Sequence, residues 1–202
     1  MMRQIFVCVF LCCAIPVVHA QTSTEGTNAV GRSGLVLDAA IGPYYSSADW
    51  KSSDNYTFSL GVGYFVAKKL SFGLRISTGS ERLSSDVAPL MAGFFALGAA
   101  EAEGVYYLHE GETWRPFLTA AFGLTTIERW GGIGYNANGG RVGAGLQLVL
   151  SRYFGCNASI DYGYKRFFML VNQTDPNNLF SPFIEHIIGL KLSFSFYPNI
   201  VP

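Results

Sequence analysis

The C-terminal segment Ile184–Phe196 carries the pattern that most constrains the fold. From Ile188 onward, bulky apolar residues alternate with small or charged ones: Ile188, Leu190, Leu192, Phe194 and Phe196 against Gly189, Lys191, Ser193 and Ser195. A period of two is typical of a β-strand with one apolar face and one polar face. Because this aromatic-ended strand lies almost at the end of the chain, it predicts the closing strand of a β-barrel, paired with the first strand.

Seven earlier segments show the same alternation. The expected strands are Leu35–Tyr45, Tyr56–Val66, Leu70–Gly79, a segment starting between Leu90 and Phe95 and ending at Leu108, Trp114–Thr125, Gly140–Leu150 and Cys156–Phe168. The clearest hairpin turns at Ala67-Lys68-Lys69, between two alternating runs. With the C-terminal segment they predict an all-β fold, an eight-stranded antiparallel up-and-down barrel.

The connections between these strands alternate between long and short. The long ones are Ser46–Asn55, Ser80–Pro89, Thr126–Gly139 and Met169–Pro182. Outer-membrane barrels have an even number of strands, short periplasmic turns and longer extracellular loops. The pattern therefore predicts a transmembrane barrel with both termini on the periplasmic side.

The N-terminal residues 1–20 have the features of a secretory signal peptide. Arg3 precedes the apolar run Ile5–Ile15, and Val18-His19-Ala20 offers small residues for cleavage before Gln21. An uncleaved anchor is the alternative, although the run is shorter than the roughly 20 residues that span a bilayer. The predicted organisation is a signal peptide (1–20), a flexible periplasmic segment (21–33), the barrel (34–197) and a C-terminal tail (198–202).

Composition agrees with an exported membrane barrel. Half of the residues are hydrophobic and 14% are charged, whereas soluble domains average about 25% charged. The formal net charge is zero, so there is no electrostatic basis for binding nucleic acid. Cleavage would leave Cys156 as the one cysteine, which excludes an internal disulfide. A closed barrel satisfies every backbone group in lipid, which such an apolar chain needs.

We expect the apolar stripe to face lipid. Its bulky residues exceed what a narrow eight-stranded lumen holds, and the opposite face is mostly Gly, Ser, Thr and Ala, unlike a solvated surface. A soluble, lipocalin-like barrel with the faces reversed is the alternative. Aromatic residues near the strand ends predict two interfacial girdles: Trp114, Tyr106, Tyr107, Tyr153, Phe154 and Tyr197 at one end, and Tyr44, Tyr45, Tyr56, Phe167, Phe168 and Phe183 at the other.

The polar face carries nearly balanced charges. Its acidic residues are Asp38, Glu101, Glu103, Asp161 and Glu185, and its basic residues are Arg75, Arg141, Lys165 and Lys191. Enclosed charges are tolerable only when they are paired and hydrogen-bonded. We therefore predict a lumenal ion-pair network that plugs the barrel, in which Glu101 and Glu103 pair with Arg75 or Arg141 and do not form a catalytic pair.

No other pattern predicts an enzyme, a metal site or a cofactor. His109 and His186 are too far apart in the chain for a metal site. His186 is followed by Ile187 and Ile188 and not by the His-x-Ser pattern expected of a lipid-modifying barrel enzyme. The glycine-rich run Gly139–Gly145 lacks the Gly-Lys-Ser/Thr ending and the following helix of a phosphate-binding loop. We expect no cofactor and no catalytic residues.

Three segments carry a resemblance to a known family: Gly61–Val66 with its Lys-Lys turn, Trp114–Phe117 leading to Ala121-Phe122-Gly123, and Gly145–Tyr153. With these, residues 35–196 resemble the small outer-membrane β-barrel (OmpA/OmpX-like) family of Gram-negative bacteria. In the last strand, Gly189, Leu192 and Phe194 are similar to the signal read by the barrel-assembly machinery.

The resemblance implies a location in the cell outer membrane. The implied partners are outer-membrane lipid and lipopolysaccharide, with the barrel-assembly machinery and periplasmic chaperones acting during insertion. The expected role is structural or surface-binding, through loops whose external ligand is unknown. A narrow porin-like channel for small solutes and a lipid-modifying enzyme are the alternatives.

Overall fold

The computed structural model describes residues 34–47, 55–83, 93–109, 111, 113–128, 134–171 and 183–198. The predicted signal peptide, the segment 21–33 and residues 199–202 of the predicted tail lie outside the described residues, as do the central parts of the four long connections. Within the described ranges no helix is long and apolar enough to cross a membrane.

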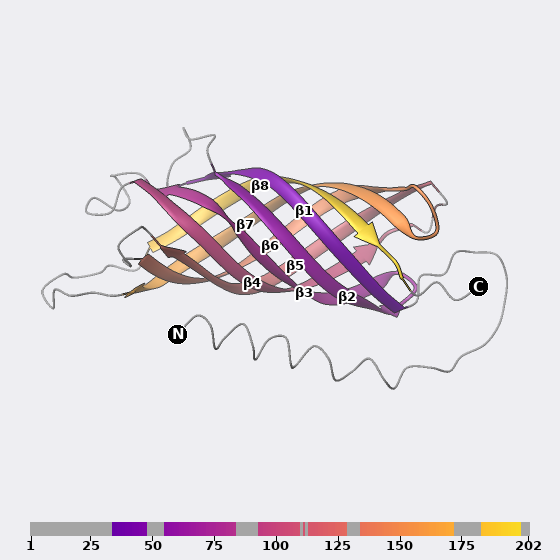
Figure 1. Ribbon diagram of the computed structural model, residues 1–202, viewed down its shortest axis with the longest axis horizontal. Coiled ribbons are helices and arrows are strands. Elements are labelled where there is room, and N and C mark those ends of the chain that lie inside the picture. Colours follow the sequence, from indigo (N-terminus) through magenta and orange to yellow (C-terminus); the bar gives the residue numbers. More distant parts are fainter. Residues whose placement is uncertain are drawn as a thin grey trace, which may run out of the picture.

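Eight antiparallel strands form one closed barrel in sequence order (Figure 1). The strands are β1 (Gly34–Ser46), β2 (Tyr56–Ala67), β3 (Leu70–Leu83), β4 (Gly93–Tyr107), β5 (Trp114–Glu128), β6 (Gly134–Val149), β7 (Phe154–Val171) and β8 (Phe183–Phe196). The predicted all-β, eight-stranded, up-and-down architecture is confirmed. We call the end with the long connections the loop end, and the end with the short turns and both barrel termini the turn end.

The seam between β1 and β8 closes the barrel. Pairing runs from Leu37 opposite Phe196 to Ser46 opposite Ile187, but it is interrupted at Gly42 and Pro43. Pro43 has no N–H group to donate to a ladder. A Cβ atom added at Gly42 would overlap the carbonyl oxygen of Leu190, so the close approach of the two strands at this point requires glycine.

Four strands extend further toward the loop end than the sequence predicts. The predicted loops Ser80–Pro89, Thr126–Gly139 and Met169–Pro182 are strand where they adjoin β3, β5, β6 and β7. The prediction of loop at those positions was wrong. Cross-strand pairing explains the difference: Ile127 lies opposite Tyr135 in the β5–β6 ladder, and both side chains are buried in the lumen. The glycine- and asparagine-rich local composition concealed this pairing and the pairing of the start of β6 with β7.

The apolar stripe of each strand faces outward, as predicted. Phe58 is 43% exposed and Phe194 is 64% exposed, and Leu146 and Leu190 also lie on the exterior. They belong to a belt of large exposed hydrophobic side chains that surrounds the barrel. An apolar exterior of this extent is solvated by lipid and not by water, and it contradicts a lipocalin-like barrel with an apolar lumen and a polar surface.

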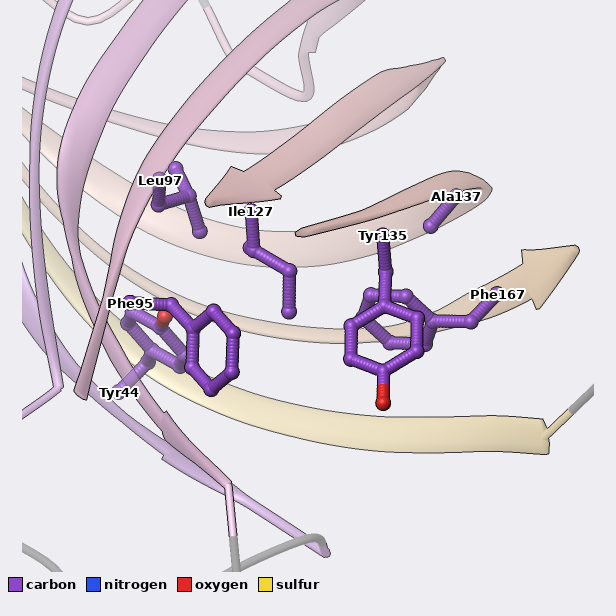
Figure 2. Packing of buried hydrophobic residues seen from close by; sticks show 7 residues of the cluster. All are labelled: Tyr44, Phe95, Leu97, Ile127, Tyr135, Ala137 and Phe167. Carbon is purple, nitrogen blue, oxygen red and sulfur yellow. The ribbon is translucent and has the colours of Figure 1, made fainter. Parts of the chain in front are cut away.

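The lumen has a layered interior. At the loop end lies a buried apolar cluster, which we call the cap (Figure 2): Tyr44, Phe95, Leu97, Ile127, Tyr135, Ala137 and Phe167. Charged side chains fill the middle, and a second buried cluster, which we call the floor, lies at the turn end: Phe65, Tyr107, Phe117 and Tyr197. Buried side chains therefore occupy both ends and the middle of the lumen.

The cap and the floor correct part of the girdle prediction. Five of the expected girdle aromatics pack inside the barrel: Tyr44, Tyr107, Phe167, Phe183 and Tyr197. Their positions have the inward parity of their strands, and inward parity decides direction whatever the distance from the strand end. Six others are exposed on the exterior: Tyr45, Tyr56, Tyr106, Trp114, Phe154 and Phe168.

Candidate functional site

All nine charged residues predicted for the lumen take part in ion pairs inside the barrel, and Glu81 joins them. They form two groups. The central cluster consists of Asp38, Arg75, Glu101, Glu103, Arg141, Asp161 and Lys191. The second group, which we call the clasp, lies below the cap and consists of Glu81, Lys165 and Glu185.

Arg75, on β3, contacts side chains of three other strands in the central cluster. Its Nη1 atom lies 2.7 Å from Oδ1 of Asp38 on β1. Its Nε and Nη2 atoms donate to the same Oε2 atom of Glu103 on β4, at 2.9 and 2.6 Å. Nη1 also donates to the hydroxyl of Ser59 at 3.0 Å. Charge-assisted bonds from this planar guanidinium fix the direction of the Glu103 carboxylate, and the Asp38 carboxylate lies in ion-pair contact with the same group.

Glu103 is the centre of the cluster because three cations converge on it. Nη2 of Arg141, on β6, lies 2.8 Å from its Oε1 atom, and Nζ of Lys191, on β8, lies 3.2 Å from the same oxygen. Arg141 also pairs with Glu101 at 3.1 Å and with Asp161 at 3.0 Å. The cluster therefore links β1, β3, β4, β6, β7 and β8.

Glycines make room for these long side chains. A Cβ atom at Gly143 would overlap the carboxylate of Asp161, and a Cβ atom at Gly163 would lie 2.9 Å from Cβ of Arg141. Gly143 on β6 and Gly163 on β7 thus meet a packing requirement of the central cluster. The glycine-rich sequence of β6 is not the phosphate-binding loop that the run of glycines could suggest.

The central cluster separates two small cavities. One, of about 100 Å³, lies toward the loop end and is lined by residues that include Glu101, Arg141 and Asp161. The other, of about 60 Å³, lies toward the turn end and is lined by residues that include Asp38 and Glu103. Arg75 and Lys191 line both. Cavities of this size hold a few water molecules.

The clasp joins β3, β7 and β8. Nζ of Lys165 lies 2.7 Å from Oε2 of Glu81 and 3.5 Å from Oε2 of Glu185. The hydroxyl of Ser46, on β1, donates to Oε1 of Glu185. The ammonium group of Lys165 also lies over the ring of Tyr44, 5.0 Å from its centroid, and the Tyr44 hydroxyl donates to the carbonyl of Ser80.

Glu81 was missed because it falls in a predicted loop. A signal for it exists, since the inward positions Arg75, Ser77 and Gly79 continue to Glu81 if the period of two is extended past the predicted strand end. The structure buries its side chain completely. With Glu81 included, the two groups contain six acids and four bases.

A polar network beside the floor was also missed. The side-chain amide of Gln147 donates to Oδ1 of Asn157 at 2.6 Å and to the hydroxyl of Tyr197 at 2.8 Å. Asn157 in turn donates to the hydroxyls of Ser193 and Ser195, both at 2.8 Å. Inward parity on β6, β7 and β8 was the available signal for these uncharged residues.

His186 lies on the exterior, paired with a tyrosine. Its Nδ1 atom and the Tyr162 hydroxyl are 2.9 Å apart, and the two rings stack. The backbone N–H of His186 donates to the hydroxyl of Ser47.

Cys156 is a free thiol, and in the part of the chain that the structure describes no group of His, Cys, Asp and Glu side chains could hold a metal ion.

Comparisons with known proteins show the fold. No protein-family model matches the chain, and no curated sequence does. Among solved structures, Neisserial surface protein A (NspA) is similar with a TM-score of 0.60 and 16% identity, covering 82% of this chain and 97% of that one. OprG, an outer membrane protein from Pseudomonas aeruginosa, has a TM-score of 0.51 and 13% identity, covering 84% and 98%. The chain thus has the fold of small eight-stranded outer-membrane barrels.

Proposed function

We propose that this protein is an integral outer-membrane barrel with a plugged lumen and a structural or surface-interaction role. The single observation that carries the proposal is the central cluster, because it crosses the lumen and joins six of the eight strands. The proposed role is non-enzymatic, with the loop end displayed outside the cell.

The exterior supports the membrane part of the proposal. Large hydrophobic side chains face outward on every strand of the barrel, and closure gives every strand a neighbour on both sides, as a barrel in lipid requires. With the loop end outside, both barrel termini reach the periplasm. Outer-membrane lipid, lipopolysaccharide and, during insertion, the barrel-assembly machinery and periplasmic chaperones are then the proposed partners.

The central cluster supports the plug. A permeating ion would have to part Arg75 from Glu103, whose bonds are 2.6 and 2.9 Å long and mostly buried. Separating a buried ion pair by removing one partner costs about 3–5 kcal/mol. The cap and the floor close the lumen further on either side.

Conductance in planar lipid bilayers tests the plug. We expect the purified wild-type protein to show no large, steady channel, and a variant with Arg75→Ala and Glu103→Ala to show more frequent openings. Lys68→Ala, in the exposed β2–β3 turn, is the matched control and should behave as wild type. A steady channel in the wild-type protein would replace the plugged barrel with the narrow porin-like alternative.

Two further measurements test the location and the absence of catalysis. Heat-modifiable gel mobility in an outer-membrane fraction would support the location, and detergent-free solubility would oppose it. Lipid analysis of a deletion strain should show unchanged outer-membrane lipids. A change that His186→Ala reproduces would favour the lipid-modifying alternative, in which the exposed Tyr162–His186 pair takes part.

A further inference from the structure

The clasp contains two carboxyl groups and one ammonium group. Glu81 of β3 and Glu185 of β8 both contact Nζ of Lys165 of β7. The side chains that β4, β5 and β6 contribute above them belong to the cap, where Phe95, Leu97 and Ile127 are apolar and Tyr135 is a neutral phenol. From β1, Ser46 reaches the clasp with its hydroxyl group and Tyr44 with the face of its ring, and neither side chain carries a charge. Two ionised carboxylates would therefore leave one negative charge uncompensated.

The carboxyl groups of the clasp are more deeply buried than those of the central cluster. The central cluster also has one more acid than base, but the side chain of Glu101 is 21% exposed. Glu101 lines the larger cavity, and of the clasp residues Lys165 lines it while Glu81 and Glu185 do not. In the clasp, Glu81 and Glu185 are both 0% exposed. An uncompensated buried charge costs several kcal/mol, and a buried carboxyl group avoids that cost by binding a proton.

The hydrogen bonds of the two carboxyl groups point to the same conclusion. Oε2 of Glu81 is satisfied by Lys165, and Oε1 of Glu185 is satisfied by Ser46. Oε1 of Glu81 and Oε2 of Glu185 have no hydrogen-bond donor among the described residues, although Lys165 lies 3.5 Å from the latter. Both carboxyl groups contact the same ammonium group, Nζ of Lys165, so they lie close to each other. A proton on one of them supplies a donor to the other.

We propose that Glu81 and Glu185 bind one proton between them at neutral pH, which makes the clasp a neutral assembly of ammonium, carboxylate and carboxylic acid. Loss of this proton would place two buried carboxylates side by side against one ammonium group. Their repulsion would then loosen β3 and β8 at the loop end. The inference goes beyond the proposed function, because it needs the burial of the clasp and not the absence of a channel.

Infrared difference spectroscopy of the folded protein in lipid tests the proposal. The probe is the carbonyl stretch of a protonated carboxylic acid at pH 7, which ionised carboxylates lack. We expect one such band in the wild-type protein and none in either Glu81→Gln or Glu185→Gln, because the remaining carboxylate then pairs alone with Lys165. Glu101→Gln, which removes a carboxyl group from the central cluster, is the matched control and should keep the band.

A variant that should gain band intensity provides a test that does not depend on the loss of the band. Lys165→Met removes the ammonium group, so both carboxyl groups should become protonated and the band should double. Heat-modifiable mobility establishes that each variant is folded before its spectrum is compared. The proposal is overturned by a wild-type spectrum without the band, by a band that both Gln variants keep, or by a band that appears only after sodium ions are removed, which would assign the site to a cation.

Discussion

Replacing Arg141 with methionine is expected to destabilise the barrel more than any conservative surface change. The variant keeps a long, unbranched side chain but removes the ion pairs to Glu101, Glu103 and Asp161, at 3.1, 2.8 and 3.0 Å. The side chain of Arg141 is mostly buried. The central cluster would then hold four acids and two bases.

The magnitude follows from burial. Breaking a buried ion pair by removing one partner costs about 3–5 kcal/mol, because the remaining charge is left uncompensated. We therefore expect the free energy of unfolding of Arg141→Met to fall by about 3–5 kcal/mol. Adding Glu101→Gln should restore part of this loss, because the double variant has three acids and two bases and thus the same excess of one acid as the wild-type cluster.

Urea titration of the protein in lipid vesicles, followed by heat-modifiable gel mobility, measures these differences. Arg152→Met is the control, since Arg152 is exposed in the β6–β7 turn and surface substitutions usually change stability by less than about 0.5 kcal/mol. Equal unfolding midpoints for Arg141→Met and Arg152→Met would refute the reasoning. So would a double variant that is less stable than Arg141→Met alone.

Two other substitutions test the exterior and the seam. Leu190→Arg places a charge on the lipid-facing belt and should cost about 2–4 kcal/mol in the same urea titration; a neutral effect would mean that this face does not contact lipid. Gly42→Ala should cost about 1–3 kcal/mol, because its Cβ atom would overlap the backbone carbonyl of Leu190. Gly98→Ala is its control, since a Cβ atom there meets no atom within 4 Å, and equal stability of the two alanine variants would contradict the close approach at the seam.

Alternation along single strands made the barrel and its faces predictable. Every inward charge in a predicted strand, such as Asp38 or Lys191, lies inside the barrel, because side-chain parity is a local property of extended backbone. The ends of the strands were less predictable. The glycine- and asparagine-rich start of β6 is held by its neighbours β5 and β7, and pairing with distant segments leaves no local pattern.

The pairing of particular charges also depends on more than local pattern. Arg75 lies directly opposite Glu101 in the β3–β4 ladder, yet its guanidinium group binds Glu103 and Asp38. Glu101 pairs instead with Arg141, which reaches it from β6 across the lumen. These choices follow from strand register and from reach across the barrel, which the order of residues along one strand does not specify.

The position of Glu103 has a consequence for how the chain assembles. Its three cationic neighbours come from β3, β6 and β8, so a sheet with seven strands in place still lacks Lys191. That seven-stranded sheet would carry carboxylates that lack a cationic partner into the bilayer, where such groups are strongly disfavoured. The ion pairs of Glu103 are complete only when the last strand brings Lys191, which should make insertion of this barrel an all-or-none event with few stable half-formed species.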